Sequence, residues 1–483
     1  MTSNLQAGVY RVDITGPLGI SLCGYIARAG VARCIERPLT ATALVLADGN
    51  HKVCIVACDL VFILSPEVDR IRQAIASELG TNVESVLINC SHTHCGPNIW
   101  DYSWDDANQK RLQREYLANL ANLLVGCASV ANERLRPARL GTGCGSAWIG
   151  INRREPGEDG KIMLGENPSG PMDPTVGVIR VDELSGRPLA VVFSYGCHTV
   201  TMGPKFLGFS PDFPGPAREL IERATGATAL FLQAAGGNIN PITGIGATED
   251  DTDNMTRLGH TLGAEVLKVA HAIRTHQKRG DPVIFASLTR NKMYPLLPAD
   301  PYEISLAAAS ETVTLPLVDP PSVEDARQIL AMREDLLAKA RRDGVPEPNQ
   351  RFFIRFRDWA AYLLREVESG KRHLSAAVPV QALRIGSLGI ATAAGETLVE
   401  LGLRAKARSP FAETLFLGYS NGCVNYIPPA ECYPEGGWSP WETYYVPDML
   451  CQSYLLPMHY KPEAAGMLVD AGVRLLNQVR PAA

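Results

Sequence analysis

The chain alternates short apolar runs with longer segments in which apolar residues recur every three or four positions. The short runs are rich in Val, Ile, Leu and Ala and end near Gly, Asp, Asn or Pro, a pattern typical of buried strands. We expect strands at 42–47, 53–59, 85–90, 176–181, 189–195, 229–233, 380–385, 389–393 and 415–419. The first two are joined by the turn residues 48–50 and are predicted to form a hairpin.

Helical segments separate many of these strands. In 65–80 the apolar residues recur at helical spacing, Pro66 stands at the first helical position and Gly80 follows the end. Further helices are expected at about 107–127, 254–275, 322–342 and 463–478, with a loop at 343–350. This mixed order of strands and helices predicts an α/β or α+β fold built in layers.

Length and composition limit how the chain is organised. The 483 residues, 46% of them hydrophobic, are enough for a large core without disulfide bonds. Such a length accommodates one large domain or roughly two or three smaller ones. Pro-rich segments at 294–301 and 315–321 interrupt the pattern, but no linker divides the chain. We therefore expect one domain over 1–483, in which 320–375 is a candidate helical insertion.

Charge and cysteine usage narrow the functional class. A formal net charge of -5 excludes a generally basic nucleic-acid-binding protein. No apolar run approaches the roughly 20 residues that a membrane span needs. The N-terminus lacks the charged and apolar regions of a secretory signal, so we expect a cytoplasmic protein. The 12 cysteines form no C-x-x-C pair, which favours buried thiols in a reducing compartment over a cysteine zinc site.

The most distinctive local feature is the segment 91–98 (SHTHCGPN), placed where a buried strand ends in a turn. We expect that His92 and His94, two positions apart, do not bind one metal ion together unless the segment turns. One histidine is then a candidate ligand and the other a candidate catalytic donor. The alternative is a pair of polar histidines bonded to the backbone.

Other polar side chains also follow predicted strands. They are His198, the asparagines of 237–241 (GNINP), Glu396 and Tyr426. A charge at the end of an apolar strand is costly without a partner, so these endings suggest one shared polar site. Imidazole and carboxylate ligands suit zinc with an open position for water, and iron or manganese is a further candidate. The alternative for Glu396 is a carboxylate at a helix N-terminus.

These motifs together resemble the catalytic domain of the neutral/alkaline, non-lysosomal ceramidase family. The similar segments occur in family order at 13–17 (DITGP), 24–25 (GY), 37–46 (RPLTATALVL), 91–97 (SHTHCGP), 151–153 (INR), 237–241 (GNINP), 395–396 (GE) and 420–427 (SNGCVNYI). The resemblance implies a layered αββα sandwich with mixed β-sheets and a metal site at strand ends. It also implies hydrolysis of an amide-type (N-acyl) bond in a small, lipid-like substrate.

The resemblance implies a role for each site residue. The zinc ligands would be His92, His198, Glu396 and Tyr426. His94 would assist at the carbonyl or the leaving group, and Arg153 would hold developing negative charge. For the tyrosine ligand, the alternatives Tyr433, Tyr444 and Tyr445 lie nearby in the sequence.

The chain departs from the family at the site and at its C-terminus. Asn240 stands where the family has a serine, and Asn238 replaces the preceding aspartate. Asparagine cannot form an acyl-enzyme as an activated serine does, so we expect metal-activated water to attack and Asn240 to orient groups by hydrogen bonds. We also expect the immunoglobulin-like C-terminal domain of the family to be absent. Two alternatives follow: the same site acts on an ester, lactone or other bond, or the protein is a non-catalytic ligand-binding homologue.

Three further features have two interpretations each. The aromatic residues Trp100, Tyr102 and Trp104 either line a substrate pocket or pack their loop. Asp59 is either a partner of a ligand histidine or a helix cap. The basic, aromatic segment 351–359 is either a nucleic-acid or membrane patch or an amphipathic segment that extends its arginines over a covering helix, and we favour the second.

Overall fold

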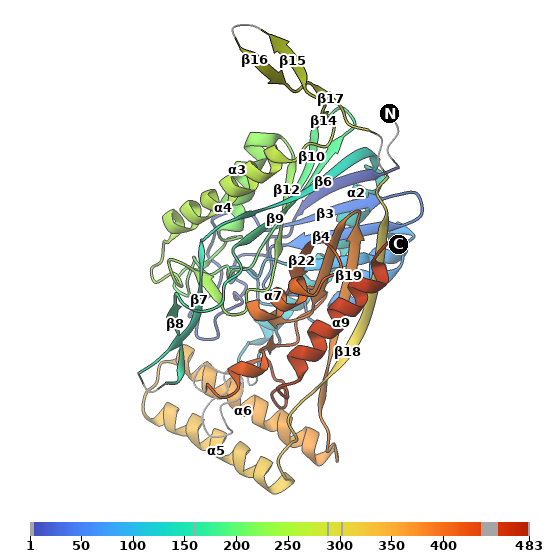
Figure 1. Ribbon diagram of the computed structural model, residues 1–483. Coiled ribbons are helices and arrows are strands. Elements are labelled where there is room, and N and C mark those ends of the chain that lie inside the picture. The colour runs from blue at the N-terminus through green and yellow to red at the C-terminus, as the bar shows by residue number, and fades with distance from the viewer. Residues whose placement is uncertain (1–3, 159, 287–288, 301–302, 436–452, 482–483) are drawn as a thin grey trace.

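Two β-sheets pack face to face, and helices cover both outer surfaces (Figure 1). Figure 1 shows the computed structural model, which describes residues 4–481 apart from 159, 287–288, 301–302 and 436–452. The predicted αββα arrangement with mixed sheets is confirmed. Within the described residues, no helix combines the length and apolar character that crossing a lipid bilayer requires.

The larger sheet has eight strands in the order β12-β10-β9-β6-β1-β3-β4-β5. In chain order these are β1 (Gln6–Asp13), β3 (Thr40–Ala47), β4 (Lys52–Cys58), β5 (Val86–Cys90), β6 (Arg136–Ser146), β9 (Thr175–Glu183), β10 (Pro188–Tyr195) and β12 (Thr228–Gln233). The pairs β4–β5 and β10–β12 are parallel, and the others are antiparallel. The predicted hairpin is the antiparallel pair β3–β4.

The smaller sheet has four strands in the order β18-β19-β20-β22. They are β18 (Leu306–Pro316), β19 (Ser375–Ile385), β20 (Leu388–Ala393) and β22 (Glu413–Leu417). Leu44 and Leu46 of β3 pack toward this sheet, whereas Ala43 and Val45 pack toward the helices outside. Because both faces of the strand are buried, its sequence is a continuous apolar run and does not alternate with polar residues.

The helices form the two outer layers. On the larger sheet lie α1 (Glu67–Leu79), α2 (Ala107–Glu133), α3 (Pro214–Thr225) and α4 (Thr252–Ala272); on the smaller sheet lie α7 (Val399–Ala407) and α9 (Ala464–Val479). Between β18 and β19 the chain forms the helical pair α5 (Val323–Arg342) and α6 (Glu347–Glu368). This pair falls within the segment 320–375 that the sequence marks as a helical insertion.

Short strands and turns complete the fold. They are β2 (Cys34–Ile35), η1 (Val83–Ser85), β7 (Gly150–Pro156), β8 (Ile162–Asn167), β11 (Gly208–Phe209), β13 (Ile239–Pro241), β14 (Gln277–Arg279), β15 (Val283–Ala286), β16 (Arg290–Met293), β17 (Leu296–Pro298), β21 (Glu396–Thr397), β23 (Tyr426–Ile427) and η2 (Ala430–Cys432). The predictions named none of these two- to four-residue strands, and they also missed the longer β1, β6, β7, β8 and β18.

The prediction of a loop over 343–350 is wrong in its second half. Helix α6 begins at Glu347, directly after Pro346. Polar residues and a proline dominate its first turn, but Phe356, Trp359 and Leu363 on its inner face are buried. The first turn has a low helix propensity, but burial of the inner face stabilises the helix by more than this propensity costs.

Both interpretations of Asp59 are wrong. Its carboxylate accepts hydrogen bonds from Arg218 Nη1 at 2.8 Å and Arg218 Nη2 at 2.7 Å, and from the backbone N–H of Thr40. The side chains of Asp59 and Arg218 are 1% and 9% exposed. The pair therefore ties α3 to the end of β4 inside the protein.

We expect Arg218→Ala to lower the free energy of unfolding by about 3–5 kcal/mol, because it leaves the Asp59 carboxylate buried without its cation. Urea unfolding followed by circular dichroism measures the change. The matched control is Arg70→Ala, which removes an exposed arginine paired with Glu67 on α1 and should leave the midpoint unchanged. Equal midpoints for the two variants would contradict this interpretation.

Candidate metal centre

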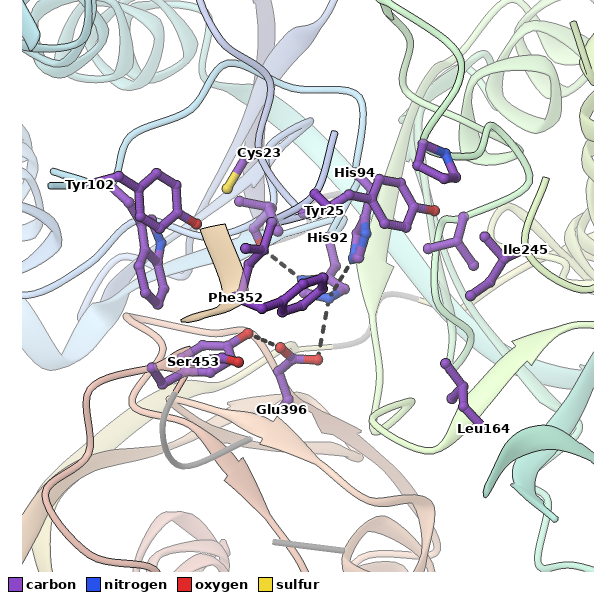
Figure 2. Close-up of a pocket in the computed structure, with 18 of the residues that line it drawn as sticks. Cys23, Tyr25, His92, His94, Tyr102, Leu164, Ile245, Phe352, Glu396 and Ser453 are labelled. Atoms are coloured by element: carbon purple, nitrogen blue, oxygen red, sulfur yellow. Dashed lines mark hydrogen bonds and ion pairs between the residues drawn. The ribbon is translucent and has the colours of Figure 1, made fainter. Parts of the chain in front are cut away.

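Polar side chains from both sheets meet at one place. His92 and His94 follow β5, and His198 follows β10. Glu396 begins β21, just after β20, and lies opposite Tyr426 of β23 in a parallel register. Figure 2 shows His92, His94 and Glu396 directed toward one another at the base of a cavity. The convergence predicted for these distant segments is confirmed.

The distances within this cluster are short. Glu396 Oε2 lies 3.2 Å from His92 Nε2 and 3.2 Å from His198 Nε2. The Nε2 atoms of His92 and His94 are also 3.2 Å apart. One ring nitrogen from each of the three histidines lies within 4.8 Å of the others, a spacing that a single metal ion would bridge.

The chain turns at His92, and both motif histidines face the cluster. His92 has a φ of 63°, in the left-handed region, so the chain does not continue as an extended strand. The backbone N–H of His92 donates to Leu60 O, and that of His94 donates to Thr199 O. His94 also lies in the cluster, and it is a further candidate ligand beside its predicted catalytic role.

Glycine allows a second segment to lie against His94. Gly24 has a φ of +94°, and a Cβ at this position would lie 2.4 Å from the His94 ring. The adjacent Tyr25 ring stands edge-on to His94, with ring centroids 4.7 Å apart. The Gly-Tyr pair near the N-terminus thus forms part of the wall of the site.

The tautomers of two histidines suit metal binding. Nδ1 of His92 lies 2.9 Å from Val61 O, and Nδ1 of His198 lies 2.8 Å from Gly236 O. A carbonyl oxygen only accepts hydrogen bonds, so each Nδ1 carries the proton. The lone pairs on Nε2 then point to the centre, as in proteins whose ligand histidines are oriented by backbone carbonyls.

The electrostatic environment favours the charge states that a cation requires. Burial, followed by the nearby Arg153, lowers the pKa of His198 to about 3. Burial also holds the pKa of His94 well below its usual value. Burial raises the pKa of Glu396, but His92 and His198 outweigh this effect and hold the pKa well below its usual range. An anionic carboxylate beside neutral imidazoles is the state in which these groups bind metals.

Arg153 of β7 joins this cluster from the side. Its Nη2 donates to Gly237 O at 2.6 Å and to Tyr426 Oη at 2.9 Å, and its Nη1 donates to Asn240 Oδ1 at 3.1 Å. Strand β13, which carries Asn240, pairs with β7. Asn240 therefore holds the guanidinium of Arg153 in place.

The side chain of Asn238 lies at the start of helix α7. Its Oδ1 accepts from the backbone N–H of Val399 at the start of α7, and its Nδ2 donates to Glu400. The two asparagines of the 237–241 segment thus face different partners, one toward Arg153 and one toward a helix N-terminus.

Three tyrosines surround Glu396. Besides Tyr426, Tyr419 donates to Glu396 Oε2 at 3.4 Å, and Tyr454 donates to Glu396 Oε1. Tyr433 instead donates to Tyr460 O, and Tyr444 and Tyr445 lie outside the described residues. Sequence reasoning missed Tyr454, which lies 58 positions from Glu396 in a segment without a strand-end pattern.

The cluster lies at the base of a cavity of about 750 Å³ with largely apolar walls. This volume is typical of a site for a small organic molecule. The walls include Phe62, Trp100, Tyr102, Leu207, Ile245 and Phe352. Trp100 and Tyr102 therefore line the cavity, as one of the two interpretations predicts, whereas Trp104 lines a separate, smaller pocket.

Helix α6 supports one side of this cavity. Arg355 donates from Nε to Ser453 O at 2.8 Å, and its guanidinium stacks over the rings of Trp100 and Tyr102 at 4.7 and 5.2 Å. Trp359 donates from Nε1 to Leu456 O. The segment 351–359 is thus part of a helix that packs against the site, and its central Arg355 is buried instead of extending into solvent.

The αββα fold and the buried His/Glu cluster define an α/β protein with a candidate metal site at strand ends. A family model described as "Neutral/alkaline non-lysosomal ceramidase, N-terminal" matches residues 5–272. The chain belongs to this family.

The curated relatives are similar over half of the chain. "Neutral ceramidase A" of Dictyostelium discoideum is 27% identical over 264 residues, which are 50% of this chain and 36% of that protein. "Neutral ceramidase B" of the same organism is 25% identical over 260 residues, 50% of this chain and 35% of that protein. The match thus spans about a third of the length of each relative.

Solved structures share the fold over nearly the whole chain. The neutral ceramidase from Pseudomonas aeruginosa superimposes with a TM-score of 0.65 and 19% identity, covering 99% of this chain and 75% of that one. A structure described as "Ceramidase complexed with C2" gives a TM-score of 0.64, also at 19% identity, covering 99% and 76% of the two chains. At this identity the likeness supports the fold alone.

Proposed function

We propose that the chain is a zinc-dependent hydrolase of an amide-type (N-acyl) bond in a small, lipid-like substrate. The observation that carries this proposal is the meeting of two Nε2 atoms and one carboxylate oxygen at 3.2 Å on the floor of an apolar cavity. Family membership and the ceramidase names of the relatives support the choice of an amide bond.

His92, His198, Glu396 and Tyr426 would hold the ion. Their nitrogen and oxygen donors suit zinc, and the backbone bonds of His92 and His198 already fix the ligand tautomers. When bound, zinc would polarise a substrate carbonyl and lower the pKa of water to near 7. Burial and Glu396 raise the pKa of Tyr426, so this phenol would remain neutral until a cation is present.

The neighbouring side chains would stabilise negative charge and transfer protons during the reaction. Arg153 extends its guanidinium to the Tyr426 hydroxyl, where it would stabilise negative charge on the carbonyl oxygen. Asn240 would orient that guanidinium through its 3.1 Å bond. His94, whose Nε2 faces the cluster, would pass a proton from the attacking water to the leaving nitrogen.

The cavity walls indicate the substrate class. Aromatic and aliphatic side chains cover most of the surface around a polar base, which suits an amide attached to a long hydrocarbon chain. The test is a panel of N-acyl-sphingosines, short-chain amides, esters and lactones, with release of the acid and amine measured for wild type and for metal-stripped protein. Metal-dependent cleavage of the long-chain amides is expected.

Asn240 favours a second candidate, the same metal site acting on an ester, lactone or other bond. The side chain at the family's serine position is engaged with Arg153, so the machinery differs from the family pattern. Cleavage of esters or lactones without any amide would favour this candidate. Tight binding of the panel without turnover of any member would contradict both and indicate a ligand-binding homologue.

We expect Arg355→Leu to lower kcat/KM for a long-chain substrate about 10–100-fold, mostly through KM. The change removes a stacked cation and the hydrogen bond from Arg355 to Ser453 O, together worth about 1–3 kcal/mol. The matched control is Arg357→Leu on the same helix, where the arginine pairs with its neighbour Asp358. Steady-state kinetics of both variants measure the effect, and equal KM values would contradict the supporting role of α6.

A further inference from the structure

A two-stranded ribbon projects from the body of the protein. It consists of β15 and β16, carried on the short pair β14 and β17, and we call the described residues of 277–298 the arm. In Figure 1 the arm extends from one end of the molecule, and α5 and α6 lie at the opposite end. A two-stranded ribbon alone is marginally stable in water. Contact with another surface would stabilise the arm.

The arm concentrates exposed apolar side chains. Among the described residues, seven of the seventeen large hydrophobic side chains that are exposed belong to it. They are Val283, Ile284, Phe285, Met293, Tyr294, Leu296 and Leu297. Single exposed apolar residues are ordinary, but seven of them in one short ribbon indicate an interaction site.

The register gives the ribbon two different faces. Val283 lies opposite Met293 and Phe285 lies opposite Asn291, so these side chains share one largely apolar face. Ile284 lies opposite Lys292, and Arg290 falls on the same, cationic face. Arg290 and Lys292 have no carboxylate partner within the described part of the chain.

The net charge of the arm indicates which surface it binds. Over 277–298 four cationic side chains and one aspartate give a net charge of +3. The whole chain carries -5, so the remainder carries -8. A cationic, apolar arm on an acidic body is complementary to the body of another copy.

We propose that the arm is a dimerisation element that lies on the body of a second copy of this chain. The apolar face packs on the partner, and Arg290 and Lys292 lie near its carboxylates. Mutual exchange of two arms closes the assembly as a symmetric pair. A lipid surface is the less favoured occupant, because Leu164 of β8 and Phe352 of α6 place the cavity toward the end away from the arm.

The test is the mass of the full chain in solution, measured by light scattering after gel filtration and by sedimentation velocity. Wild type is expected to be a dimer at micromolar concentration. The double variant V283D/F285D should raise the dimer Kd about 100-fold or more, because two apolar anchors become charged. The matched control is Leu336→Asp, which charges an exposed leucine of α5 at the other end and should leave the dimer intact.

Two further measurements separate the remaining outcomes. Charge reversal by R290E/K292E should also favour the monomer, and circular dichroism should show that each variant keeps its fold. A monomeric wild type, or a dimer unaffected by V283D/F285D, would overturn the proposal. So would arm-dependent flotation of a monomer with vesicles of anionic phospholipid, which would assign the arm to a membrane.

Discussion

His198→Ala is expected to abolish stoichiometric zinc binding and to lower hydrolytic activity by about 10³-fold or more. The substitution removes a buried imidazole whose Nε2 lies 3.2 Å from Glu396 and whose Nδ1 is held by Gly236 O. A metal ion contributes several kcal/mol of transition-state stabilisation, and each 1.36 kcal/mol is tenfold in rate. The remaining donors would bind zinc too weakly to retain it through dialysis.

Elemental analysis of dialysed protein and steady-state kinetics measure these two effects together. The matched control is His271→Ala, which removes an exposed histidine near the end of α4 and should retain both zinc and activity. A His198→Ala protein that keeps one zinc per chain would contradict the ligand assignment. Loss of activity with full zinc would move His198 from the ligand set to the group that acts on the substrate.

Arg153→Gln is expected to lower kcat about 10²–10³-fold while zinc content stays at the wild-type level. Its guanidinium is buried and bonds to Asn240, Gly237 O and Tyr426. Removal of one preorganised donor from an oxyanion site commonly costs this much. Arg153→Lys should recover only part of the loss, because an ammonium group cannot reproduce the planar fork.

Asn240→Ala tests whether Asn240 acts through Arg153. As a positioning residue it should lower kcat less than Arg153→Gln, and the double variant should be no worse than Arg153→Gln alone. Kinetic constants of the four proteins form the cycle. Fully additive losses would show that Asn240 contacts the substrate independently of Arg153. A separate experiment tests the attacking group: a covalent acyl group trapped on the wild-type chain would contradict attack by water.

Much of the fold was predictable because the buried strands are apolar on both faces. The runs at 53–59 and 189–195 correspond to β4 and β10, and Gly80 ends α1 where predicted. The polar residues that follow such runs were equally visible, which is why His92, His198 and Glu396 could be identified. Their meeting was not visible, because they follow β5, β10 and β20, strands of two different sheets that do not pair with one another.

The rest depends on contacts that no local pattern records. The start of α6 is stabilised by burial of Trp359 and Leu363, not by its first turn. Tyr454 reaches Glu396 from a segment held by Arg355, so its role required tertiary coordinates. Asp59, at a strand end, was a candidate partner of a ligand histidine, but it pairs with Arg218, which is 159 positions away in the sequence.

In the proposed site, one divalent cation is held by His92, His198 and Glu396. Anomalous diffraction from crystals of the zinc-loaded protein, with data on both sides of the zinc absorption edge, tests it most directly. We expect one strong peak in each chain, bounded by the Nε2 atoms of both histidines and the Glu396 carboxylate. A peak at another position, or none in protein that still turns over substrate, would contradict it.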